Sequence, residues 1–91
     1  MNTLIAIDIG NTSIHMARYS GGKWTNHKRV PTKEYRGSAL SKLRTLLPKD
    51  KKAVVIIASV VPAAGKYLQS AISKKLGVTA HLLAPSFPSP S

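Results

Sequence analysis

A short polar segment, Asp8-Ile9-Gly10-Asn11-Thr12, combines residue types suited to binding a phosphate and a cation. It follows the apolar run Leu4–Ile7 and precedes a second strand-like run. Gly10 has no Cβ, so a phosphate can approach the backbone closely, and successive N–H groups in a turn form an anion-binding concavity. Thr12 adds a hydroxyl donor. Asp8 is a candidate Mg²⁺ ligand through water, because Mg²⁺ keeps much of its hydration shell.

The same five residues also suit an ordinary hairpin turn. Asp, Gly and Asn favour turns for conformational reasons alone, without any ligand. The segment by itself therefore leaves two interpretations open, a phosphate site and a structural turn. The elements around it and a second motif further along the chain decide between them.

Apolar periodicity predicts five strands and two helices. Gly21-Gly22 signals a hairpin turn, Pro62 suits the first turn of a helix, and Gly77 suits a helix end. Ser38 is expected to cap the first helix. The expected strands and then the expected helices are Thr3–Ile9, Ser13–Ser20, Lys23–Val30, Ala53–Val61, Val78–Ala84, Ser38–Leu47 and Pro62–Leu76.

The predicted order is β-β-β-α-β-α-β, which gives an α/β fold with a mixed sheet. The unbroken apolar run Ala53–Val61 is typical of a parallel strand covered on both faces. Right-handed crossovers fix the hand of the last two units. This order is the ribonuclease H-like topology, which also forms each half of actin-like ATPases and sugar kinases. We expect one domain over residues 1–84 and a flexible tail over residues 85–91.

The composition excludes several classes of protein. With 91 residues the chain supports a single core, and with no cysteine it has neither disulfides nor thiolate metal sites. No apolar segment approaches the roughly 20 residues that span a bilayer, and no signal peptide is evident. We therefore expect a cytoplasmic protein. The dispersed His15, His27 and His81 give no metal-ligand spacing.

The chain is strongly basic, with 14 Lys and Arg against 3 Asp and Glu and a net charge of +11. Such a charge attracts anions, either nucleic acid or an acidic partner. The cations are scattered along the chain and form no motif, so nucleic acid is the less favoured partner. Nuclease chemistry with two metals needs several acidic ligands, whereas Glu34 and Asp50 are badly placed to join Asp8.

A second motif, Ser59-Val60-Val61-Pro62, closes the buried strand and opens a helix. The two motifs, about fifty residues apart, together resemble the type III pantothenate kinase family over residues 1–84. The resemblance implies an actin-like kinase domain. Members of the type III pantothenate kinase family phosphorylate pantothenate with ATP in the first step of coenzyme A biosynthesis. They use Mg²⁺ and K⁺ or NH₄⁺, and they form homodimers. The family's phosphate loop would fall on Asp8, Ile9, Gly10, Asn11, Thr12, Ser13, Ile14 and His15, with Asp8 at the metal.

The chain departs from this family in length, because its members are more than twice as long. Their catalytic base, second phosphate loop and adenosine pocket lie beyond the equivalent of Ser91. The resemblance therefore implies an N-terminal, ATP-binding portion that is inactive alone, with no catalytic residue in this chain. Its partner would be a second copy or a complementary C-terminal half. The alternatives are a basic ribonuclease H-like nucleic-acid-binding module and a non-catalytic interaction module.

Overall fold

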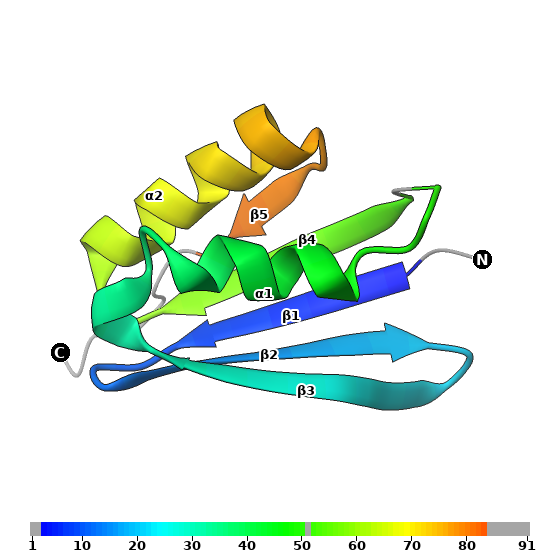
Figure 1. Cartoon of the computed structure of the whole chain (residues 1–91), viewed down its shortest axis with the longest axis horizontal. Helices are drawn as coiled ribbons and strands as arrows, with labels where there is room; N and C mark the ends of the chain where they lie inside the picture. Colours follow the sequence, from blue (N-terminus) through cyan, green and yellow to red (C-terminus); the bar gives the residue numbers. More distant parts are fainter. Residues whose placement is uncertain (1–2, 51, 84–91) are drawn as a thin grey trace, which may run out of the picture.

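The fold is a mixed five-stranded sheet with two helices packed on it (Figure 1). The computed structural model describes residues 3–50 and 52–83. The strand order across the sheet is β3-β2-β1-β4-β5. In chain order the elements are β1 (Thr3–Ile9), β2 (Ser13–Ser20), β3 (Lys23–Pro31), η1 (Thr32–Glu34), α1 (Ser38–Leu46), β4 (Ala53–Ser59), α2 (Pro62–Ala71), η2 (Ile72–Leu76) and β5 (Ala80–Leu82).

The predicted element order is confirmed. β1 pairs antiparallel with β2 and parallel with β4, and β3 continues the antiparallel meander while β5 continues the parallel part. Gly21 and Gly22, with φ of 62° and 81°, make the β2–β3 turn, as their lack of a Cβ allows. The ribonuclease H-like name for this order stays a prediction.

The core lies between one face of the sheet and the two helices. Every second residue of β1 points to this face, so Ile5, Ile7 and Ile9 are buried. Ile14 and Met16 of β2 join them, as the predicted alternation requires. The helices contribute their apolar stripes, which include Ala39, Leu43, Leu46, Ala64, Leu68 and Ile72.

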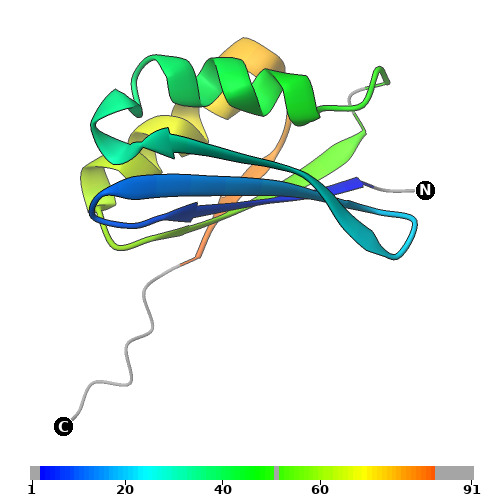
Figure 2. The ribbon, with the colours of Figure 1, turned by 60° about the horizontal axis from the view of Figure 1, so that its bottom comes forward.

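The opposite face of the sheet, here called the open face, carries no helix in the described ranges (Figure 2). The expectation that β4 is covered on both faces is therefore wrong for this part of the chain. Val54 is 37% exposed, and Ile56 and Ala58 are half-buried. The run is apolar because it is the centre of a parallel β1-β4-β5 unit, and Val55 and Ile57 are its buried residues on the helix side.

Several boundaries differ from the sequence-based prediction. Ser38 is the first helical residue and bonds to the Glu34 carboxylate, while Gly37 is the cap residue, so the predicted Ser38 cap is wrong. β4 ends at Ser59, because the chain turns at Val60-Val61 before Pro62. The helix end at Gly77 is confirmed by its left-handed φ of 67°.

The last strand is shorter than expected, Ala80–Leu82 instead of Val78–Ala84. Val78 is buried in the core ahead of the strand. Ala84 and the predicted tail over residues 85–91 lie outside the described residues. In the part of the chain that is described, no helix is long and apolar enough to cross a bilayer.

Candidate phosphate-binding site

The predicted phosphate segment forms the turn between β1 and β2, with Gly10, Asn11 and Thr12 outside both strands (Figure 1). The N–H of Gly10 donates to the carbonyl of Ser13 at 2.9 Å, which closes a four-residue turn. A Cβ on Gly10 would lie 3.3 Å from that same carbonyl oxygen. Glycine therefore suits this position because the turn brings two parts of the backbone together.

The start of η1 fixes the conformation of this turn. The Thr32 hydroxyl donates to the carbonyl of Gly10 at 2.8 Å, and the Thr32 N–H donates to the carbonyl of Thr12 at 2.9 Å. Thr32 is only 6% exposed. The buried Thr32 thus binds two carbonyl groups of the turn and holds them facing the interior of the protein.

This arrangement directs backbone N–H groups away from Thr32. The Gly10 carbonyl belongs to the same peptide as the Asn11 N–H, and the Thr12 carbonyl to the same peptide as the Ser13 N–H. In a trans peptide the N–H points opposite to the carbonyl, so these two N–H groups point away from Thr32. Within the described ranges, neither Asn11 nor Thr12 donates its N–H to a backbone carbonyl. The turn therefore has unused backbone donors together with the exposed hydroxyl of Thr12.

Asp8 lies on the open face, two residues before the turn, and its side chain is exposed. Its register partners are His15 on β2 and Ala58 on β4. Asp8, His15 and His27 line a cavity of about 160 Å³ on this face. No cluster of three or more His, Asp or Glu suited to a metal occurs among residues 3–50 and 52–83. One carboxylate fits Mg²⁺ that keeps waters and phosphate oxygens as its other ligands.

The structure separates the predicted site residues into two groups. Asp8, Gly10, Asn11, Thr12, Ser13 and His15 lie at the surface or partly exposed. The side chains of Ile9 and Ile14 are fully buried in the core. These two isoleucines pair with each other across β1 and β2, so their contribution is to anchor both ends of the turn.

The second motif lies directly beside this turn. The N–H of Val60 donates to the carbonyl of Ile9 at 3.0 Å, which joins the end of β4 to the end of β1. The Ser59 hydroxyl accepts from the N–H of Val61 at 3.0 Å and donates to the Val61 carbonyl at 2.7 Å. Ser59 therefore shapes the β4–α2 turn instead of capping α2. The parallel pairing of β1 and β4 is what brings the two motifs together.

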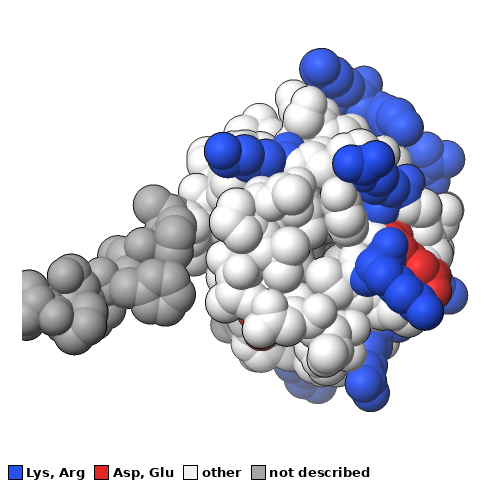
Figure 3. Space-filling view, turned by 90° about the vertical axis from the view of Figure 1, so that its left-hand side faces the viewer, with Lys and Arg blue, Asp and Glu red and all other residues white. Residues whose placement is uncertain are grey.

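Basic side chains lie along several margins of the end of the molecule that carries the β1–β2 turn. In Figure 3, which views this end, Lys and Arg side chains lie at the top, right and bottom, with an acidic patch among them on the right, and the centre is uncharged. Val60, 54% exposed, belongs to the uncharged β4–α2 connection at this end. A cationic margin raises the local concentration of anions near the turn.

Sequence reasoning missed Thr32 and Arg29. The Arg29 Nε donates to the Ser13 hydroxyl at 3.2 Å. Both residues belong to the β3–η1 region, far from the turn in sequence. The antiparallel pairing of β2 with β3 places them beside it, and the only signal in the sequence was the expected hairpin at Gly21-Gly22.

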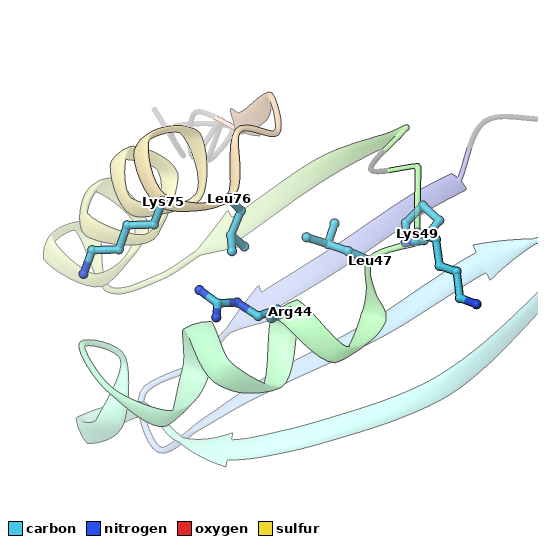
Figure 4. Close-up of a pocket in the computed structure, with 6 residues that line it drawn as sticks. Arg44, Leu47, Lys49, Lys75 and Leu76 are labelled. Atoms are coloured by element: carbon cyan, nitrogen blue, oxygen red, sulfur yellow. The ribbon is translucent and has the colours of Figure 1, made fainter.

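A basic cavity of about 430 Å³ lies at the other end of the sheet, between the ends of α1 and η2 (Figure 4). Arg44, Lys49 and Lys75 line it together with Leu47, Pro48 and Leu76. Arg44 and Lys75 stand in the last turns of their helices, where cations interact favourably with the helix dipole. In Figure 4, Lys49 and Lys75 point away from each other. Helix electrostatics thus explain Arg44 and Lys75.

Comparison with solved structures shows the fold. YeaZ from Pseudomonas aeruginosa matches with a TM-score of 0.58 and 18% identity, over 92% of this chain and 43% of that one. The Aquifex aeolicus PPX-GPPA enzyme matches with a TM-score of 0.51 and 14% identity, over 91% of this chain and 36% of that one. The chain therefore spans less than half the length of these structures. No curated protein sequence matches it.

The family comparison covers nearly the whole chain. The sequence model of the family described as type III pantothenate kinase matches residues 4–88. This range contains both motifs and, apart from Thr3 at the start of β1, every strand and helix from β1 to β5. The match agrees with the resemblance carried by the β1–β2 turn and the β4–α2 turn. The chain belongs to the type III pantothenate kinase family.

Proposed function

We propose that this chain is the ATP-phosphate-binding portion of a pantothenate kinase. The observation that carries the proposal is the β1–β2 turn, whose carbonyls are bound by Thr32 while the N–H groups of Asn11 and Thr12 have no backbone acceptor in the described ranges. Such donors bind phosphate oxygens, and they are in place before the ligand arrives. Membership of the family supports ATP as the nucleotide and pantothenate as the acceptor.

Each residue of the site has a definite role in this proposal. The N–H groups of Asn11 and Thr12 and the hydroxyls of Thr12 and Ser13 hold phosphate oxygens. Asp8 holds Mg²⁺ through water, and the bound ion neutralises charge on the phosphate chain. Gly10 and the anchoring Ile9 keep the turn in shape. A monovalent cation, K⁺ or NH₄⁺, completes the cofactors that we propose for the whole enzyme.

We further propose that this portion has no kinase turnover alone. Phosphoryl transfer to a hydroxyl uses a base that accepts the hydroxyl proton. Besides Asp8, the carboxylates of the chain are Glu34, which bonds to Ser38, and Asp50, which accepts from the Lys52 N–H. Both carboxylates are engaged in these bonds, and Asp50 lies in the α1–β4 connection, away from the turn. The base would come from a complementary C-terminal half, and the complete enzyme would be a homodimer in the cytoplasm.

The proposal is tested by NMR on the ¹⁵N-labelled chain titrated with ATP and Mg²⁺. We expect chemical-shift changes centred on the amides of Asn11 and Thr12, with weak, millimolar affinity. Adenosine, which lacks phosphates, is the matched ligand and is expected to leave these amides unchanged. No response of the turn to ATP, together with salt-dependent binding of a DNA duplex, would instead support the nucleic-acid-binding alternative.

Catalysis needs a separate assay. The purified chain is incubated with ATP, Mg²⁺, K⁺ and pantothenate, and phosphopantothenate is measured by mass spectrometry. We expect no product. ATP-dependent product formed by this chain alone would contradict the assignment of the catalytic base to another chain or another part of the enzyme.

A further inference from the structure

Arg29 lies beside the β1–β2 turn, although it belongs to β3. Its Nε donates to the Ser13 hydroxyl at 3.2 Å. A guanidinium carries five N–H donors, so this bond leaves four for another acceptor. The bond to Ser13 also restricts a long side chain that would otherwise sample many rotamers, which lowers the entropy cost of holding a ligand.

The register of the sheet places Arg29 and Asp8 on either side of the start of β2. Asp8 on β1 is opposite His15 on β2, and His15 is opposite Arg29 on β3. All three side chains belong to the open face, as does Ser13, because alternate residues of a strand share a face. Neighbouring strands lie about 4.8 Å apart, so the backbones of Asp8 and Arg29 are separated by about 10 Å. A phosphate chain with a cation at one end bridges this span.

The surface around Arg29 has the chemistry of an anion site. A cavity of about 370 Å³ is lined by Arg29, Thr12, Ser13, Val30 and Pro31. It offers a guanidinium and two hydroxyls, and no carboxylate lines it. Arginine binds phosphate through two parallel N–H bonds, which makes it the stronger and more directional choice among the cations.

We propose that Arg29 is a phosphate-binding residue, which holds a second phosphate group of the nucleotide on the side of the β1–β2 turn away from Asp8. The inference rests on the proposed function, because it takes the ligand of the turn to be a nucleotide with more than one phosphate. In this arrangement Asp8 and its Mg²⁺, the turn and Arg29 bind successive parts of one anionic chain.

A purely structural role for Arg29 on the edge strand predicts a different experimental result from phosphate binding. β3 is an edge strand, and exposed cations on edge strands discourage pairing with other chains. That role requires only a positive charge. It does not depend on the bond to Ser13, on the neighbouring hydroxyls or on the guanidinium shape, so Lys would serve equally well.

The test uses magnesium pyrophosphate as the probe and NMR of the 91-residue chain as the readout. The Arg29 Nε–H resonance and the Asn11 and Thr12 amides are followed together in the unaltered chain. We then compare R29Q, R29K and R44Q. Arg44 is also an exposed arginine, but it stands at the far end of the sheet, so R44Q removes the same charge without touching the turn.

We expect R29Q to weaken pyrophosphate binding by about tenfold, which corresponds to loss of a hydrogen bond to a charged group. R29K should recover part of this loss, and R44Q should change the affinity by less than twofold. In the unaltered chain, pyrophosphate bound to the other four N–H donors should shift the resonance of the neighbouring Arg29 Nε–H. That measurement does not depend on the folding of any variant.

The possible outcomes separate this inference from the proposed function. If Asn11 and Thr12 respond but R29Q binds as tightly as R44Q, the role of Arg29 is overturned and the turn stands. If the Arg29 resonance responds while the turn does not, Arg29 binds phosphate and the proposed function of the turn fails. If neither responds, both proposals fall.

Discussion

The Thr32 hydroxyl donates a hydrogen bond of 2.8 Å to the carbonyl of Gly10, twenty-two residues earlier in the chain. This bond joins the start of η1 to the phosphate turn. Because Thr32 is almost fully buried and the bond is partly buried, water replaces the bond only in part when it is lost. The orientation of the turn, and with it the direction of its free N–H groups, depends on this contact.

We therefore expect Thr32→Val to lower the free energy of unfolding by about 1–2 kcal/mol, the cost of leaving the partly buried carbonyl of Gly10 without this donor. The Thr32 N–H bond to Thr12 remains, so the fold survives and the turn loosens. Thermal unfolding measures the first effect, and hydrogen exchange at the Gly10 amide, which donates to the Ser13 carbonyl, measures the second.

Thr45→Val is the matched control for this change. The Thr45 hydroxyl also donates to a backbone carbonyl, that of Lys42, but on an exposed turn of α1 where water takes its place. We expect a change within about 0.5 kcal/mol. Equal destabilisation by both substitutions would show that the Thr32 bond has no special role in the turn.

Gly65 lies where α2 packs closely against the sheet. A Cβ at this position would lie 3.0 Å from Leu82 Cδ1 and 3.0 Å from Ser59 Cβ. Gly65→Ala gains about 1 kcal/mol of helix propensity, but overpacking costs about 1–3 kcal/mol. We expect net destabilisation in a denaturant titration, with NMR shifts at Ser59 beside the phosphate turn.

Gly37 offers the contrast for this prediction, because a Cβ there would meet no atom within 4 Å. Gly37 is the cap residue of α1, where Ala is less favourable than Gly, so Gly37→Ala should cost about 0.5–1 kcal/mol without any overpacking. It should leave the Ser59 resonances unchanged. If Gly65→Ala also leaves them unchanged, α2 has room to move away from Ser59 and Leu82, and the close approach does not constrain the fold.

The aromatic pair on the hairpin offers a third test. Tyr19 and Trp24 are register partners on β2 and β3. Their ring centroids are 5.0 Å apart, and the ring planes are tilted by 58°. Trp24 is 48% exposed and is the single tryptophan of the sequence. We expect Tyr19→Ala to cost about 0.5–1.5 kcal/mol and to shift the Trp24 fluorescence maximum to longer wavelength. An unchanged spectrum would show that the rings do not pack together in solution.

The parts of the fold that depend on local pattern could be predicted from the sequence. β1 and β2 have the predicted bounds, because their alternation is regular and Gly10 interrupts it. η1 could not be predicted, since Thr32-Lys33-Glu34 has no periodicity and its position depends on burying Thr32 under the turn. The bare open face was also missed, because an apolar run does not indicate how many of its sides are covered.

The candidate site divides in the same way. Asp8 and the turn are contiguous and carry recognisable residue types, so the sequence identifies them. Thr32 and Arg29 reach the turn through the pairing of β2 with β3, and their contacts require both the register and the side-chain directions. Sequence spacing contains neither piece of information in a single chain.

Asp8→Asn tests the proposed magnesium ligand. Asp8 is exposed, so removing its charge should change the stability little. Without Mg²⁺, a carboxylate beside the turn repels the phosphates, and Asp8→Asn should bind free ATP as well as the unaltered chain or better. With Mg²⁺ the unaltered chain gains affinity and Asp8→Asn does not. NMR titration measures the ratio of the ATP affinity with Mg²⁺ to the ATP affinity without it. We expect this ratio to be about tenfold lower in Asp8→Asn than in the unaltered chain, or about 1.4 kcal/mol.

Asp50→Asn removes the same charge away from the turn and keeps an oxygen for the Lys52 N–H. It should retain the full effect of Mg²⁺ on ATP binding. If Asp8→Asn also retains it, the ion is bound by the nucleotide alone and Asp8 has no part in the site. If both substitutions reduce it equally, the effect is one of net charge, and the position of Asp8 at the end of β1 does not matter.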